Sequence, residues 1–192
     1  VLGDRVFVGI WLTASCCFAG LFSYISTSSL LLQETFGLRE TEFGVVFAIC
    51  SVGVFVGVQL GSRLSAHLGP QRVLIVGTAG MIVAASLLLG LDAMRSGHIP
   101  LIPAMFAYTL AFGACNPAAQ VLALQNHRKD SGVAASLMGT LNMTLAAVVG
   151  PVIGQFELAS AAPMAISMLC CAAAAALCLW LIARPRRIEF TL

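Results

Sequence analysis

Charged side chains are scarce in this sequence, since Asp, Glu, Lys and Arg together make up 9% of its 192 residues. An ordinary globular domain carries about 25% charged residues. Hydrophobic residues make up 59% of the chain, and its mean hydropathy is +0.98. A soluble domain needs polar side chains to cover its surface, so the composition excludes that class and predicts a membrane protein whose main partner is the lipid bilayer. The net charge of +2 is too small to suggest a nucleic-acid partner.

The sequence also lacks the motifs of disulfide frameworks, metal sites and enzymes. Its seven cysteines are an odd number, and none falls in a CxxC pair or a Cys/His cluster. No GxSxG, HExxH, GxGxxG or phosphate-binding P-loop sequence occurs. We therefore expect no disulfide framework, no metal or other cofactor, and no enzymatic activity.

What the sequence does contain is six long apolar runs whose central parts are free of charge. A helix needs about 20 apolar residues to cross a bilayer core of about 30 Å. Backbone polar groups in lipid must be satisfied within the segment, which favours helices over strands. The predicted fold class is an all-α membrane protein with six transmembrane helices. The predicted spans are about 5–28, 41–62, 72–94, 100–124, 132–154 and 162–184.

The basic residues gather on one side of the predicted membrane. With six spans, the two chain ends and the second and fourth connections share one side. That side carries 8 of the 10 basic residues, namely Arg5, Arg63, Arg72, Arg128, Lys129, Arg184, Arg186 and Arg187. Lysine and arginine near the ends of spans are retained in the cytoplasm. The distribution therefore predicts that both termini are cytoplasmic.

Two spans carry small residues at four-residue spacing. The positions are Gly53, Gly57 and Gly61 in the second span and Ala146, Gly150 and Gly154 in the fifth. Such spacing lets two helix backbones approach closely. We therefore predict at least two tight helix–helix seams, which either pack statically or let helices slide. Pro117 and Pro151 lie inside the fourth and fifth spans, and because proline removes a helical hydrogen bond, both are candidate bend points for gating.

Uncharged polar and aromatic side chains lie inside the spans, whereas no Asp, Glu, Lys or Arg lies deep in any of them. His67, His98 and His127 all fall in connections, so the chain offers no obvious proton relay. Amides that face lipid are costly, so the polar side chains face either a neighbouring helix or a wet cavity for large uncharged ligands. The candidate cavity residues are Phe22, Tyr24, Tyr108, Asn116, Gln120 and Asn142.

Three stretches together resemble a known family. They are FSYISTSSLLLQETFGLRETEFGVVFA (Phe22–Ala48), GSRLSAHLGPQRVL (Gly61–Leu74) and SGVAASLMGTLNM (Ser131–Met143). The chain resembles the C-terminal six-helix half of the major facilitator superfamily and, more narrowly, the bicyclomycin/chloramphenicol-resistance type of drug:proton antiporter. The resemblance implies a twelve-helix bundle of two halves around a central cavity, working by alternating access.

The same resemblance implies a bacterial inner-membrane location, a small hydrophobic substrate, and protons as the coupling ion. The coupling residues would lie in an N-terminal half that is absent from this sequence. The chain begins without Met and without the features of a signal peptide, so we expect it to be the middle or end of a longer protein.

The connection after the second span departs from the family's loop motif, G-x-x-x-D-R-x-G-R-R. When the motif is aligned on Gly69, its aspartate falls on Ala66 and its first glycine on Ser62. Arg63 and Arg72 supply the positive charge of this predicted cytoplasmic loop. The pattern fits the degenerate copy of the motif that the second half of the family carries.

The sequence leaves three functions open. The first is efflux of hydrophobic drugs or other small xenobiotics by proton exchange, and the run Gly150-Pro151-x-x-Gly154 supports it because it resembles the antiporter motif of the first half's fifth helix. The second is a major facilitator carrier of another small solute such as a sugar or an amino acid, although anionic cargo normally needs buried basic residues that these spans lack. The third is a stand-alone six-helix membrane partner subunit.

Overall fold

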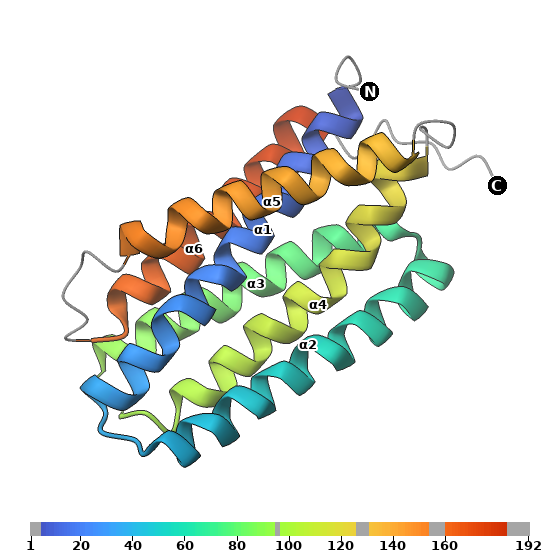
Figure 1. Cartoon of the computed structure of the whole chain (residues 1–192). Helices are drawn as coiled ribbons and strands as arrows, with labels where there is room; N and C mark the ends of the chain where they lie inside the picture. Colours follow the sequence, from blue (N-terminus) through green and yellow to red (C-terminus); the bar gives the residue numbers. More distant parts are fainter. Residues whose placement is uncertain (1–4, 95–96, 126–130, 154–159, 184–192) are drawn as a thin grey trace.

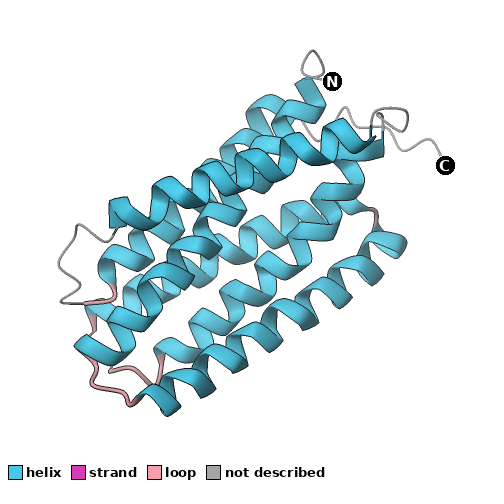
Figure 2. Cartoon of the chain, in the orientation of Figure 1, coloured by secondary structure: helices cyan, strands magenta, loops and turns pink. Residues whose placement is uncertain are grey.

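The computed structural model describes residues 5–94, 97–125, 131–153 and 160–183, and these residues form helices joined by short turns, with no strand among them (Figures 1 and 2). The helices are α1 (Arg5–Ser29), α2 (Glu40–Leu68), α3 (Pro70–Ala93), α4 (Leu101–Gln125), α5 (Ser131–Ile153) and α6 (Ala162–Cys178). Short π-helical segments continue α1 as η1 (Leu30–Thr35) and α6 as η3 (Leu179–Ala183). All six helices are long and apolar enough to cross a membrane. The prediction of an all-α protein with six transmembrane helices is confirmed.

The turn between η1 and α2 is built from residues that suit a helix end and a helix start. Gly37 has a φ of +70°, a left-handed conformation that glycine adopts without steric cost. Arg39 is the N-cap of α2, and its backbone N–H donates to the Glu42 carboxylate at 2.9 Å. The Arg39 guanidinium lies 3.2 Å from the same carboxylate. Glu40 and Glu42 thus lie in the first turn of α2, where carboxylates interact favourably with the helix dipole.

The connection between α2 and α3 is tighter than the apolar runs alone indicate. The apolar run that predicts the second span ends near residue 62, yet α2 continues through polar residues to Leu68. Gly69, with a φ of +86°, separates the two helices, and Pro70 begins α3. A single glycine in a left-handed conformation reverses the chain, and proline suits the first helical position because its missing N–H has no partner there.

The helices form two layers (Figure 1). The four helices α5, α1, α4 and α2 lie side by side in that order, and α6 and α3 lie behind them. The core is centred on α1 and α4, where Tyr108, Met105 and Ile10 are fully buried. More than half of the most apolar part of α4 is buried (56%), against 17% of α5 and 22% of α2. The two outer helices of the front layer therefore keep most of their surface exposed.

The charged residues lie at the two ends of the helices. Arg5 begins α1, Arg63 lies near the end of α2, and Arg72 lies in the first turn of α3, which places them at one end of the bundle. The acidic residues of the described chain lie at the other end, namely Glu34, Glu40, Glu42 and Asp92. The middle of the bundle carries no charge in the described residues. Which end faces the cytoplasm stays a prediction.

Candidate functional site

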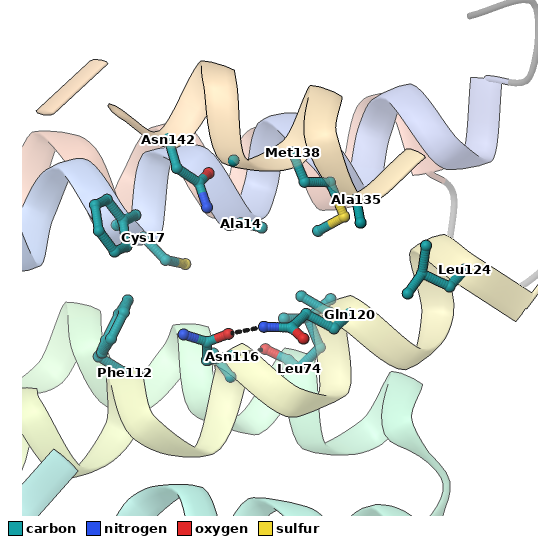
Figure 3. Close-up of a pocket in the computed structure, with 14 residues that line it drawn as sticks. Ala14, Cys17, Leu74, Phe112, Asn116, Gln120, Leu124, Ala135, Met138 and Asn142 are labelled. Carbon is teal, nitrogen blue, oxygen red and sulfur yellow. Dashed lines mark hydrogen bonds between the residues drawn. The ribbon is translucent and has the colours of Figure 1, made fainter. Parts of the chain in front are cut away.

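A cavity of about 210 Å³ lies between α1, α4 and α5 (Figure 3). α1 contributes Ala14, Cys17 and Phe18, and α3 contributes Leu74. The α4 wall consists of Phe112, Cys115, Asn116, Ala119, Gln120 and Leu124, and the α5 wall of Ala135, Met138, Gly139 and Asn142. None of these side chains is charged, so the cavity suits neutral ligands.

Carboxamide groups supply the polar part of the cavity from two opposite walls. On α4, Gln120 Nε2 donates a hydrogen bond of 2.7 Å to Asn116 Oδ1. On α5, Asn142 Oδ1 accepts a hydrogen bond of 2.7 Å from Ser15 Oγ of α1. Figure 3 shows the amide nitrogen of Asn142 pointing from α5 into the cavity, towards the wall that α4 forms. Asn116 and Asn142 are half-buried and Gln120 is exposed, so the cavity opens at the surface of the front layer.

Aromatic rings and sulfur atoms supply the apolar part. The rings of Phe18 and Phe112 lie 6.2 Å apart and tilted at 57°, which joins α1 to α4 at one end of the cavity. The thiols of Cys17 and Cys115 contact each other across the same two helices, and Cys115 Sγ also lies 4.0 Å from the carbonyl oxygen of Leu74. Polarizable sulfur and aromatic surface adapt to apolar ligands of different shapes.

The structure brings three of the six predicted cavity residues together, namely Asn116, Gln120 and Asn142. Phe22 lies one turn beyond the cavity and stacks on Phe18 with ring centres 6.2 Å apart. Tyr24 is buried and stacks on Phe47 of α2, at 6.3 Å and 8° between the rings. Tyr108 is fully buried, with its hydroxyl 3.5 Å from the carbonyl oxygen of Met168. Tyr24 and Tyr108 therefore lie in the packing between helices, Phe22 lies beside Phe18 on α1, and none of the three lines this cavity.

Sequence reasoning did not single out Phe112, Met138, Cys17 and Cys115 as cavity residues. Phe112 lies four residues before Asn116, and Met138 lies four residues before Asn142. Residues four apart share a helix face. The face that carries each amide was therefore a signal that could have identified both residues. The two cysteines offered no such signal, because their pairing depends on how α1 and α4 dock.

The four-residue glycine repeat of α2 packs against α4. A methyl group added at Gly57 would collide with the carbonyl oxygen of Leu110, and one added at Gly61 would collide with the backbone of Ala114. At Gly53 it would lie 2.8 Å from Thr109 Oγ1. Only glycine permits this approach, so α2 and α4 form a tight seam.

The other residues predicted for packing or gating lie on α4 and α5. Gly150 faces α1, since a methyl group added there would lie 3.3 Å from Ser26 Oγ. Pro117 and Pro151 are inside α4 and α5, and both helices continue through them. In Figure 1 the end of α4 turns away from α2 and towards the start of α5. Gly154 lies outside the described residues.

The predicted loop residues flank the tight turn between α2 and α3. Gly69 adopts the left-handed conformation described above, while Arg63 and Arg72 are exposed on the helices before and after it. Among the described residues, no group of three or more His, Cys, Asp or Glu side chains could hold a metal ion.

A family model and two curated relatives match this sequence. The sequence model of the Major Facilitator Superfamily matches residues 1–151. An uncharacterized MFS-type transporter, YdgK of Bacillus subtilis, is 25% identical over 168 residues, which cover 88% of this chain and 42% of that protein. A bicyclomycin resistance protein homolog of Haemophilus influenzae is 23% identical over 164 residues, which cover 85% of this chain and 41% of that protein. The chain thus spans about two fifths of the length of these curated relatives. No solved structure matches the chain significantly.

Proposed function

Because the chain belongs to the Major Facilitator Superfamily, whose members are membrane transporters, we propose that it is the C-terminal six-helix half of a carrier that exports hydrophobic drugs or similar small xenobiotics in exchange for protons. The observation that carries this proposal is the uncharged cavity between α1, α4 and α5. Two aromatic rings, two thiols and three carboxamides line it, a set that suits neutral, largely apolar compounds. An anionic cargo would need a buried basic residue, and the described walls hold none.

The drug class is supported by one of the relatives. That protein is named as a bicyclomycin resistance protein homolog, and resistance to a small molecule is a typical result of export. Alternating access in this family exposes one cavity to each side of the membrane in turn. The cavity of this chain opens at the surface of the front layer, as a cavity shared with a second half would.

The front layer supports the proposal that a second six-helix half covers it. α2 and α5 are its outer helices, and both expose small and hydroxyl side chains, among them Ser51 on α2 and Ser136, Thr140 and Thr144 on α5. Each of these four hydroxyls donates to a carbonyl oxygen in its own helix, so it needs no further partner when it is covered. Such helix faces suit close packing against another helix in lipid.

The proton-coupling residue is proposed to lie in that second half. Proton relays in membranes use Asp, Glu or His within the spans. The described middle of this bundle holds none of these residues. The six helices would then supply cargo contacts and packing surfaces, and the other half would supply the titrating group.

The test uses the complete gene expressed in bacteria that lack their own exporters. Cells are loaded with a hydrophobic fluorescent dye, and its loss is followed with and without a protonophore. We expect energised cells to lose the dye several-fold faster than cells with a collapsed gradient. Dye loss that ignores the gradient would contradict proton coupling. No dye loss, together with uptake of a labelled sugar or amino acid, would favour the other carrier class, and we expect the 192-residue chain alone to transport nothing.

A further inference from the structure

The orientation of the carboxamides in the cavity carries information about the cargo. A carboxamide has one acceptor oxygen and an NH₂ group with two donors. Asn142 Oδ1 is occupied by the Ser15 hydroxyl, and Asn116 Oδ1 is occupied by the Gln120 amide. Each asparagine is thereby fixed with its oxygen bound by a neighbour. Each oxygen thus has one of its two acceptor positions filled, whereas both N–H donors of each asparagine remain for a ligand.

The two NH₂ groups lie on opposite walls of the cavity. Figure 3 shows the Asn142 nitrogen pointing into the cavity from α5, while Asn116 lines the facing wall on α4. Among the described residues, no acceptor is bonded to either nitrogen. Gln120 Oε1 is the one carboxamide oxygen in the cavity that accepts no hydrogen bond from a described residue. The polar part of the cavity therefore presents free N–H donors from both walls without carrying a charge.

We propose that this cavity selects uncharged cargo that carries acceptor oxygens such as ketone, amide or lactone carbonyls, held between the NH₂ groups of Asn116 and Asn142. The inference rests on the proposed function, because it names the class of compound that the carrier moves. The rings of Phe18 and Phe112 line the same cavity and offer an apolar surface to the rest of the ligand.

The preference for carbonyl ligands follows from what the NH₂ groups bond to once a ligand has displaced the water. In the open cavity, water accepts from both NH₂ groups. A ligand that displaces this water without offering acceptors leaves buried donors without partners, which is unfavourable. A ligand with a carbonyl restores the bond. A site that is built to hydrogen-bond its ligand discriminates strongly against an analogue that lacks the bonding group.

Ser15 is a positioning residue in this scheme. Its hydroxyl donates to Asn142 Oδ1 and so decides which end of that amide faces the cavity. Without the hydroxyl, the amide is free to turn its oxygen inward. The cavity would then present an acceptor where it now presents a donor, and its preference for carbonyl ligands would fall although no contact residue had changed.

Fluorenone and fluorene form a matched pair of probes, because they share one flat skeleton and differ by a single carbonyl oxygen. Binding of each is measured to the purified complete protein in lipid nanodiscs, with no proton gradient. We expect fluorenone to bind about fivefold more tightly than fluorene, the ratio expected for one net hydrogen bond. A ratio near one would overturn the inference.

Three variants test the assignment. In Asn116→Leu and Asn142→Leu the ratio should fall several-fold, because fluorenone loses its hydrogen bond and fluorene no longer leaves a donor without a partner. Ser15→Ala should lower the ratio although the residue does not touch the ligand, and it serves as the second test if an asparagine variant does not fold. Met138→Leu is the matched control, since it changes the α5 wall of the cavity without changing a donor.

An unchanged ratio in the folded asparagine variants would overturn the inference, and so would an equal fall in Met138→Leu. The two proposals fail separately. A high fluorenone preference without gradient-driven dye loss would contradict the exporter but not the donor assignment. Dye export with a ratio of one would contradict only the donor assignment.

Discussion

Close packing between α2 and α4 depends on individual glycines. Gly57 and Gly113 face each other, because a methyl group added to either one would lie about 3 Å from the Cα atom of the other, at 3.0 Å and 3.1 Å. The contact needs a glycine on both helices. In lipid, where the hydrophobic effect does not draw helices together, such a seam is stabilised by dispersion between backbones.

Replacing Gly57 by Ala should therefore destabilise the protein, because the new methyl group collides with a rigid carbonyl, that of Leu110. Overpacking of this kind costs about 1–3 kcal/mol. The measurement is the unfolding midpoint of the complete protein in detergent, followed by fluorescence-detected size exclusion after heating. Gly44→Ala is the matched control in the same helix, since no atom lies within 4 Å of its added methyl group. Equal midpoints for the two variants would contradict the seam.

The contact between Cys17 and Cys115 makes a second prediction at this scale. Both thiols are buried and line the cavity. In a variant that keeps only these two cysteines, mild oxidation should form a disulfide between α1 and α4, detected by mass spectrometry of the linked peptides. A cavity ligand should slow the reaction because it blocks access for the oxidant.

The control for that experiment keeps Cys50 and Cys178 instead. Cys50 contacts Tyr24 and Cys178 contacts Cys16, so these two cysteines have different neighbours and should stay reduced. Linkage in the control pair and none in the Cys17/Cys115 variant would contradict the way in which α1 and α4 dock.

At the scale of helices, the sequence predicts well where a helix forms, but it predicts poorly which neighbours each face of that helix meets. Six apolar runs gave six helices, because a backbone in lipid has few alternatives. One polar face of α4 shows the limit. Thr109, Gly113, Asn116 and Gln120 follow each other at helical spacing, yet the first two face α2 and the last two face the cavity. Periodicity identifies the face, but only the path of the neighbouring helices decides what that face meets along its length.

The same limit applies more strongly to the aromatic residues than to the amides. A buried amide needs a hydrogen-bond partner, so its surroundings are restricted to polar neighbours or a wet cavity. Tyr24 and Phe22 can stack equally well on a ring within the core or on a ligand. The sequence does not distinguish these environments, whereas the structure places Tyr24 on Phe47 and Phe22 on Phe18.

The attachment of α5 to α1 also belongs to this scale. α5 packs mainly on α1, and two side-chain bonds connect them. Trp11 Nε1 donates to the carbonyl oxygen of Leu137 at 3.1 Å, and Ser15 donates to Asn142. Because α5 has few other neighbours among the described residues, these bonds should restrain its motion relative to the rest of the bundle.

Trp11→Phe keeps an aromatic ring but removes the indole donor, at a cost of about 1 kcal/mol. We expect faster hydrogen exchange in α5 and unchanged exchange in α3, measured on the complete protein by mass spectrometry. Trp180→Phe is the control, since that side chain is exposed in η3. Equal exchange in the two variants would show that the indole bond does not hold α5.

At the scale of the whole molecule, the distribution of charge indicates how the bundle lies in the bilayer. Three of the four described arginines, Arg5, Arg63 and Arg72, lie at one end, and the fourth, Arg39, lies with the acidic residues at the other. In the sequence, Arg128 and Lys129 also follow α4. Basic residues beside a span resist translocation, so this end should be cytoplasmic.

Single cysteines in a cysteine-free variant of the complete protein test that orientation. Thr41 lies in the first turn of α2 and His67 in its last turn, and both are exposed. A membrane-impermeant maleimide should label Thr41→Cys on intact bacterial spheroplasts, and should label His67→Cys only after lysis. The two positions share one helix, so each controls for the folding and insertion of the other. The reverse pattern would place the arginine-bearing end outside the cell and would contradict the predicted orientation.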